Sequence, residues 1–260
     1  MIRVKRKKLT AVPVLIILAV ALFAIILMVE KPSLVPAGKS VNVSAEGGAG
    51  DYFLPQDPEA QLAVFTKLFE LYGEDHPEKL EAYPMTWGFA REVSEEEKEV
   101  RLQVVEKAKK WLGVKEADGS HQAIVDVYNS HTPLARDYPA TYEDSWCSVF
   151  VSVVSIQCGL TDIIPTECGC ERQIGLWQEL GRWEEDDNAI PLPGDIIYYN
   201  WDQKDPGENS GWSDHVGIVV GTKWPFVKII EGNYDDRVKE RVIFLGDYRI
   251  RGYGLPDYTG

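Results

Sequence analysis

A run of 21 residues without a charged side chain, from Leu9 to Val29, most strongly constrains what this 260-residue chain can form. About 20 apolar residues are enough to cross the hydrocarbon core of a bilayer as a helix. Arg3 and the basic stretch Lys5–Lys8 come just before the run, which favours a cytoplasmic N-terminus. We therefore predict a basic cytoplasmic tail over residues 1–8, a single-pass transmembrane signal anchor over residues 9–29, and an extracytoplasmic remainder.

A cleaved signal peptide, followed by secretion, is the alternative to an anchor. Val35-Pro36-Ala37 has the small-residue character of a cleavage site. The apolar run is longer than the hydrophobic part of a typical signal peptide, however, and Glu30-Lys31 lie between the run and this site. These two features favour the anchor.

Charge is distributed unevenly along the chain, whose formal net charge is -14. Residues 1–40 hold seven basic side chains and one acidic one, whereas the remaining 220 residues hold 20 basic and 40 acidic ones. The acidic charge of residues 41–260 argues against binding to the phosphate backbone of a nucleic acid, because proteins that bind this backbone gain affinity from lysine and arginine. Peptide substrates that carry free amines remain compatible with it.

Residues 30–93 are predicted to be a linker with a short helical collar, and residues 94–260 a folded domain. The linker is rich in proline and glycine and shows no hydrophobic period up to residue 60. The collar helix is expected over residues 59–72, where Leu62, Phe65 and Phe69 fall on one side.

Helical patterns come first in the domain and strand patterns follow. Ser94 and Glu97 have the spacing of a capping box, and Ser120 and Ser145 are expected to cap two further helices. Helices followed by strands indicate an α+β domain in which N-terminal helices pack on an antiparallel sheet. The predicted helices cover residues 94–112, Ser120 to Tyr128, Trp146–Cys158 and Glu171–Leu180; the predicted strands cover Asp195–Tyr199, His215–Val220, Phe226–Glu231, Arg237–Leu245 and Arg249–Tyr253.

Cys147 is expected in the first turn of the third helix, where a nucleophilic thiol would be activated. Free N–H groups and the positive end of the helix dipole favour a thiolate there. The same N–H groups are suited to hold an oxyanion during attack on a carbonyl. A buried cysteine in an apolar helix is the alternative for this residue alone.

His215 is the histidine best placed to act as a base for Cys147. It opens a predicted strand directly after a polar loop, and a histidine at the mouth of a sheet facing a helix N-terminus has the geometry of a cysteine–histidine pair. Glu231 and Asn233 end the next strand, so either side chain is expected to orient the His215 ring. Turn formation by Gly232-Asn233 is the alternative explanation.

The other cysteines give no clear indication of a metal site. The spacing in Cys168-Gly169-Cys170 lacks the gap of usual zinc ligand pairs, and no histidine stands at a fitting distance. Cys158, Cys168 and Cys170 are interpreted as buried small residues or as containing one disulfide. Neither a metal nor a cofactor is expected.

Four sequence blocks together resemble the CHAP family, the cysteine, histidine-dependent amidohydrolases/peptidases. The resemblance covers residues 95–256 and rests on the order of the blocks, since each alone is weak. The blocks are WCSVFVS from Trp146, PGDIIYY from Pro193, SDHVGIV from Ser213 and IEGN from Ile230.

The resemblance implies a papain-like fold and hydrolysis of amide bonds in peptidoglycan, either in the stem peptide or in the cross-bridge. It assigns nucleophilic attack to Cys147, base and acid catalysis to His215, and orientation of the imidazole to Glu231 and Asn233. One departure is that Asp137, Glu143 and Asp144, before the cysteine, are too scattered for the calcium loop of some relatives. No wall-binding module is expected, so the anchor over residues 9–29 would supply the local concentration.

Three aromatic residues are candidates for the substrate cleft. Tyr142 is a possible second oxyanion donor, and Trp146 and Trp212 flank the catalytic blocks, although core or loop packing is the alternative for both tryptophans. Two other functions compete with this prediction: an NlpC-type wall endopeptidase, and an inactive membrane-tethered module that only binds the wall. The type of bond cut, amidase or endopeptidase, stays open.

Overall fold

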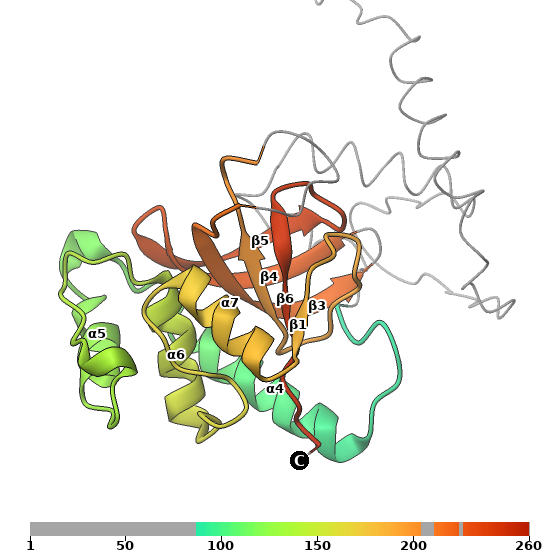
Figure 1. Ribbon diagram of the computed structural model, residues 1–260, viewed down its shortest axis with the longest axis horizontal. Helices are drawn as coiled ribbons and strands as arrows, with labels where there is room; N and C mark the ends of the chain where they lie inside the picture. Colours follow the sequence, from blue (N-terminus) through green and yellow to red (C-terminus); the bar gives the residue numbers. More distant parts are fainter. Residues whose placement is uncertain (1–86, 204–210, 224–225, 260) are drawn as a thin grey trace, which may run out of the picture. The chain divides into compact units, whose positions relative to one another are not determined.

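The computed structural model describes residues 87–203, 211–223 and 226–259 (Figure 1). The predicted cytoplasmic tail, the anchor over residues 9–29 and the collar helix over residues 59–72 lie outside these ranges. Across the residues that are described, no helix is both long and apolar enough to span a bilayer.

The described chain is an α+β unit with four α-helices followed by a six-stranded antiparallel sheet, which confirms the predicted class. The strand order in the sheet is β1-β6-β2-β3-β4-β5. The helices are α4 (Glu95–Lys109), α5 (Gln122–Asn129), α6 (Cys147–Cys158) and α7 (Cys170–Glu179). The strands are β1 (Trp183–Glu184), β2 (Ile196–Tyr199), β3 (His215–Lys223), β4 (Phe226–Tyr234), β5 (Arg237–Phe244) and β6 (Ile250–Gly254).

One of the three predicted helix caps forms. The Ser94 hydroxyl accepts a hydrogen bond from the Glu97 N–H at 3.1 Å, so α4 begins as predicted. Ser120 does not cap α5, because its hydroxyl accepts from the Lys115 N–H instead and His121 takes the cap position. Ser145 does not cap α6 either: Trp146 precedes the helix and makes no side-chain cap bond. The first N–H groups of α6 are therefore left for other partners.

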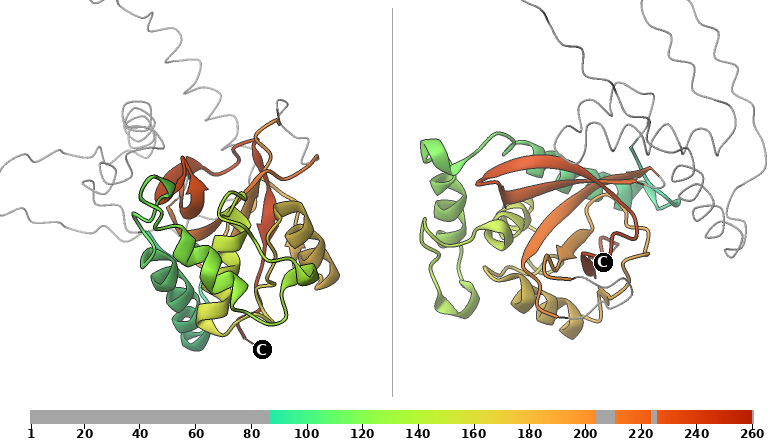
Figure 2. Two further views of the ribbon diagram at one scale, coloured as in Figure 1. Left: turned by 90° about the vertical axis from the view of Figure 1, so that its left-hand side faces the viewer. Right: turned by 90° about the horizontal axis from the view of Figure 1, so that it is seen from above.

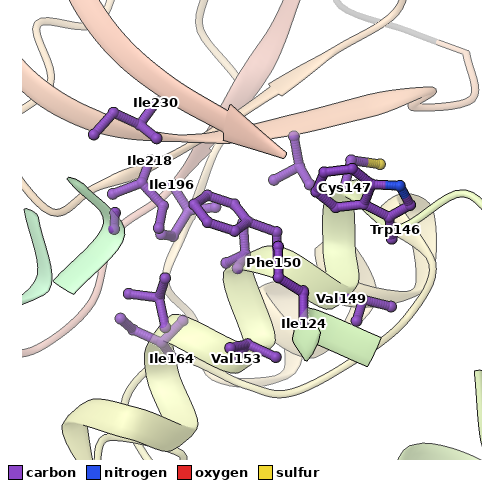
Figure 3. Close-up of a cluster of buried hydrophobic side chains, with 14 of the residues drawn as sticks. Ile124, Trp146, Cys147, Val149, Phe150, Val153, Ile164, Ile196, Ile218 and Ile230 are labelled. Atoms are coloured by element: carbon purple, nitrogen blue, oxygen red, sulfur yellow. The ribbon is translucent and has the colours of Figure 1, made fainter. Parts of the chain in front are cut away.

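Helix α6 is the central element of the main core. Figures 1 and 2 show the helices gathered on one side of the sheet, with α6 between α5 and the strands. Figure 3 shows Phe150 extending from α6 toward Ile196 and Ile218 of the sheet, while Cys147 lies at one end of the cluster. Burial of this apolar surface fixes the position of the first turn of α6 against the sheet.

The sheet is buried on both faces. Ile196 and Tyr198 belong to the helix-facing core, and Ile197 and Tyr199 belong to a second apolar cluster. This explains why β2 is a continuous run of large apolar residues and does not alternate with polar ones.

A buried ion pair joins α4 to the turn before β2. The Arg101 guanidinium lies 2.7 Å from the Asp195 carboxylate and donates to the Pro193 carbonyl at 3.0 Å. The Asp195 carboxylate also accepts from the Leu192 N–H at 2.7 Å. The Pro193-Gly194-Asp195 block of the sequence therefore serves as a structural turn that holds β2 against α4.

Candidate active site

Cys147 is the first residue of α6 and is 4% exposed. Its Sγ atom lies 3.5 Å from the Sγ of Cys170. The hydrogen bond from Cys170 lowers the pKa of Cys147 well below its ordinary value; burial opposes this shift, and His215 and the Ser148 N–H add to it. Cys147 is therefore placed to be a thiolate at neutral pH, as expected for a nucleophile.

His215 opens β3 and is 6% exposed. Its Nε2 atom lies 3.4 Å from Oε1 of Glu231, which is an ion-pair distance rather than a hydrogen bond. Burial disfavours the charged imidazole, but the interactions with Cys147 and Glu231 outweigh it and raise the pKa of His215 to about 9. Because Nε2 faces Glu231, the other ring nitrogen, Nδ1, is left for the thiol.

Glu231 is a fully buried carboxylate on β4 and is held by Arg241 of β5. The Arg241 Nη2 donates to Oε1 at 2.8 Å, and its Nε donates to Oε2, so the contact is bidentate. Burial raises the pKa of Glu231, but the Arg241 charge outweighs it and lowers the pKa to about 2. Between about pH 2 and pH 9 the Glu231 carboxylate is thus ionised while the His215 imidazole is charged.

Gly217 creates the space in which Glu231 meets His215. Gly217 pairs directly with Glu231 across β3 and β4, and a Cβ atom on Gly217 would lie 2.7 Å from the Glu231 Cγ. His215 and Gly217 are two residues apart on one strand, so they share a face. The Glu231 side chain lies over Gly217 and approaches His215.

Aromatic rings enclose the charged groups. The His215 ring centroid lies 6.0 Å from that of Tyr199, 5.7 Å from that of Trp201 and 5.9 Å from that of Tyr234. The same three rings surround the Arg241 guanidinium, with Tyr234 at 4.0 Å. Excluding water in this way strengthens the attraction between the charges.

The end of β4 approaches α6 closely at Gly232. A Cβ atom at this position would lie 2.4 Å from the Phe150 Cβ and 3.0 Å from Cζ3 of Trp146. The absence of a side chain at Gly232 therefore allows β4 to pack closely on α6. This contact places Glu231 next to the first turn of α6.

Gly232→Ala is expected to destabilise the protein by about 1–3 kcal/mol, because the added methyl group overpacks this contact. Thermal unfolding measures the effect. Gly175→Ala is the matched control: the site lies in α7 with no atom within 4 Å of its Cβ position. This control should be neutral or slightly stabilising, since alanine favours helix over glycine. Equal stability of the two variants would contradict the close approach.

Asn233, predicted to help orient the His215 ring, forms no hydrogen bond to that ring among the described residues. It adopts a left-handed backbone conformation with φ 58°, at an irregularity in the pairing of β4 with β5. Its side chain is half-buried and makes no hydrogen bond within the described ranges. Glu231 is the residue that approaches His215.

The three candidate cleft residues lie in different environments. Trp146 is fully buried and its Nε1 donates to Glu116 at 2.9 Å, so its position fits core packing rather than a cleft wall. The Tyr142 hydroxyl donates to Asp126 at 2.7 Å, and the side chain is exposed. Trp212 is 68% exposed and directly precedes the loop into β3.

Cys170 is a site residue that the sequence interpretation missed. It is the first residue of α7, is 7% exposed, and is bound by the Ser148 hydroxyl at a 3.7 Å Oγ–Sγ distance. The adjacent Glu171 accepts from the Ser213 N–H at 2.9 Å, which ties the start of α7 to the loop before His215. All four cysteines are free thiols, so the disulfide considered among Cys158, Cys168 and Cys170 is not present.

The position of Cys170 in the sequence could have identified it as a candidate site residue. Cys147 stands in the first turn of one predicted helix and Cys170 directly precedes another, so both thiols could have been inferred to lie beside the free N–H groups of a helix start. Over the described ranges, no three side chains of the metal-ligating types lie together as a metal site. The chemistry that these residues offer is nucleophilic attack by a thiolate with a charged imidazole beside it.

Comparisons with known proteins identify no family. No family model matches this sequence, and no curated protein matches it. Among solved structures, the crystal structure of Ly7917 is similar to 60% of this chain, with 14% sequence identity and a TM-score of 0.35. The matched part spans 62% of Ly7917. A likeness at this level carries no weight for fold or function.

Proposed function

We propose that this protein is a cysteine amidohydrolase of the CHAP type, with a papain-like fold, that cuts amide bonds in peptidoglycan. The observation that carries the proposal is the buried chain of alternating charges Cys147, His215, Glu231 and Arg241. A thiol whose pKa is lowered, beside an imidazole whose pKa is raised to about 9, is arranged for attack on a carbonyl. The substrate class comes from the sequence resemblance alone.

The first half of the reaction uses the ion pair of Cys147 and His215. The Cys147 thiolate attacks the carbonyl carbon of the amide, and the oxyanion is held by N–H groups at the start of α6. His215 then gives its proton to the departing amine, which leaves a thioester on Cys147.

The second half regenerates the enzyme. Neutral His215 takes a proton from water, the resulting hydroxide attacks the thioester, and the Cys147 thiolate departs as the new carboxylate forms. Glu231 stabilises the imidazolium in both halves and fixes the ring orientation. Arg241 keeps Glu231 ionised and in place, so it is a positioning residue.

The compartment is part of the same proposal. With residues 9–29 as a signal anchor, the domain would be held outside the membrane next to its polymeric substrate, and the linker and collar over residues 30–93 would set its reach. The alternative functions predict different outcomes: an NlpC-type endopeptidase would release only cross-bridge or stem-peptide fragments, and an inactive module would bind the wall without cutting it.

The proposal is tested by incubating purified peptidoglycan with the full chain and reading soluble products by mass spectrometry. Released fragments with a new amine and a new carboxylate support the hydrolase, and their masses identify the bond. The same protein pre-treated with iodoacetamide is the control and should release nothing. If the untreated protein sediments with the wall and releases no fragment, the binding module is the correct function.

The pH dependence of hydrolysis follows from the pKa shifts. Activity is expected to be already high at neutral pH, because Cys147 ionises well below its ordinary range, and to fall as pH rises through about 9, where His215 loses the proton that the leaving amine needs. The profile of kcat/KM against pH measures this, with iodoacetamide alkylation of Cys147 as a separate readout of the thiolate. An upper limb near the ordinary histidine value of 6.5 would contradict the raised pKa.

A further inference from the structure

Cys147 and Cys170 form a pair of thiols whose closeness the hydrolytic mechanism does not require. Their sulfur atoms are 3.5 Å apart, and a disulfide bond needs about 2.0 Å. Each cysteine is the first residue of its helix, and both side chains are more than nine-tenths buried. Bond formation thus requires the two sulfur atoms to approach by about 1.5 Å.

The two thiols have the complementary states that stepwise oxidation needs. The pKa of Cys147 is lowered well below its ordinary value, which favours the thiolate. The hydrogen bond to Cys147, together with burial, raises the pKa of Cys170 well above its ordinary value and favours the thiol. A thiolate is the form that attacks an oxidant, and a neighbouring thiol can then resolve the oxidised sulfur. Cys158 and Cys168 are only half-buried, and burial raises the pKa of both.

We propose that Cys147 and Cys170 are a site of reversible oxidation, where a hydroperoxide converts the two thiols into an intramolecular disulfide. In the first step the Cys147 thiolate attacks the terminal peroxide oxygen and the O–O bond breaks. Cys147 becomes a sulfenic acid while the alkoxide leaves, or hydroxide where the oxidant is hydrogen peroxide. In the second step the Cys170 sulfur attacks the sulfenic sulfur and water leaves, taking the Cys170 proton. Two electrons pass from the thiols to the peroxide in total.

The consequence for catalysis rests on the proposed function: the disulfide withdraws the nucleophile, so the oxidised protein cannot form the thioester. A dithiol reductant restores both thiols. Cys170 would also capture the sulfenic acid before further oxidation, which protects Cys147 from irreversible damage.

The test uses the full chain carrying Cys158→Ser and Cys168→Ser, because only Cys147 and Cys170 then remain of the four cysteines. The reduced protein is treated with hydrogen peroxide, then with iodoacetamide, and is cut with a protease specific for glutamate. Glu143, Glu167 and Glu171 bound two peptides, residues 144–167 and 168–171, each with one cysteine. Trypsin would be unsuitable, since residues 137–172 lack an internal lysine or arginine.

The expected result is a cross-linked pair of these peptides, lighter than the two free peptides by two hydrogen atoms, and complete loss of alkylation at both cysteines. Dithiothreitol should reverse it. Adding Cys170→Ser should instead give Cys147 carrying extra oxygen. The wild-type chain, treated alike, should fall from four alkylated cysteines to two. Oxygen addition at Cys147 with Cys170 still alkylated in the two-cysteine protein would overturn the proposal.

Peptidoglycan digestion by the same samples separates the two proposals. Loss of activity on oxidation and its return with dithiothreitol support the regulatory consequence. A disulfide that forms in a protein whose reduced state cuts no peptidoglycan supports the oxidation site and rejects the hydrolase. Equal digestion by the oxidised and reduced proteins would overturn the regulatory consequence.

Discussion

Cys147→Ala is expected to lower fragment release from peptidoglycan by at least about 10⁴-fold, to the uncatalysed background. In the proposed mechanism the thiolate forms the bond to the substrate carbon, and Cys170 is not expected to replace it, since its pKa is raised well above the ordinary value and it stands at the start of a different helix. The oxyanion donors remain in the variant, so binding of the wall should persist.

The matched control for this variant is Cys158→Ala, at the other end of the same helix. It removes a half-buried thiol of the same size and should keep wild-type activity, because Cys158 has no contact with His215 or Cys147. Circular dichroism and thermal unfolding of both variants exclude a folding defect. Substantial residual cutting by Cys147→Ala would show that the nucleophile lies elsewhere.

Among the variants proposed for this protein, Arg241→Met is expected to lower the free energy of unfolding most. It leaves the Glu231 carboxylate buried beside aromatic rings without its bidentate partner, and removal of one member of such a pair costs about 3–5 kcal/mol. The midpoint of thermal unfolding should fall by on the order of 10 °C. Activity should fall as well, because Glu231 no longer has a fixed position opposite His215.

A double variant distinguishes the lost charge pair from lost packing. Arg241→Met combined with Glu231→Gln removes both charges, so it should recover part of the stability lost in the single variant. Arg182→Met is the exposed control, since Arg182 pairs with Asp257 at the surface, and the change should cost less than about 1 kcal/mol. A double variant no more stable than Arg241→Met would mean that packing of the arginine dominates.

The sequence predicted the helices and five strands because their hydrophobic periods and end signals are local. Gly159 ends α6 in a left-handed conformation, as its position after the apolar run indicated. Strand β1 was missed because two residues are too short for a pattern, and in the sheet it pairs with β6. The α5 cap was misplaced because Ser120 binds back to Lys115 and Asp118 instead of to the helix.

Site residues that stand at the start of a helix or strand could be predicted from the sequence. A site residue whose contacts depend on how two strands pair could not. Cys147 and His215 each open an element, so their roles could be inferred from position. Arg241 lies within a strand whose pattern gives no hint of a buried charge. Its contact with Glu231 depends on the pairing of Ile229 with Arg241, which places the two side chains diagonally on one face.

Cys147 lies on α6, its hydrogen-bond partner Cys170 lies on α7, and the charged groups of the site lie on β3, β4 and β5. This arrangement also orders events during synthesis. The helix leaves the ribosome before the strands, because the chain is made from its N-terminus. Until the last strands pair, the thiol has no imidazole beside it and no completed sheet to exclude water. We therefore expect Cys147 to become a reactive thiolate only when the domain has folded. In the nascent chain it is an ordinary, weakly nucleophilic thiol.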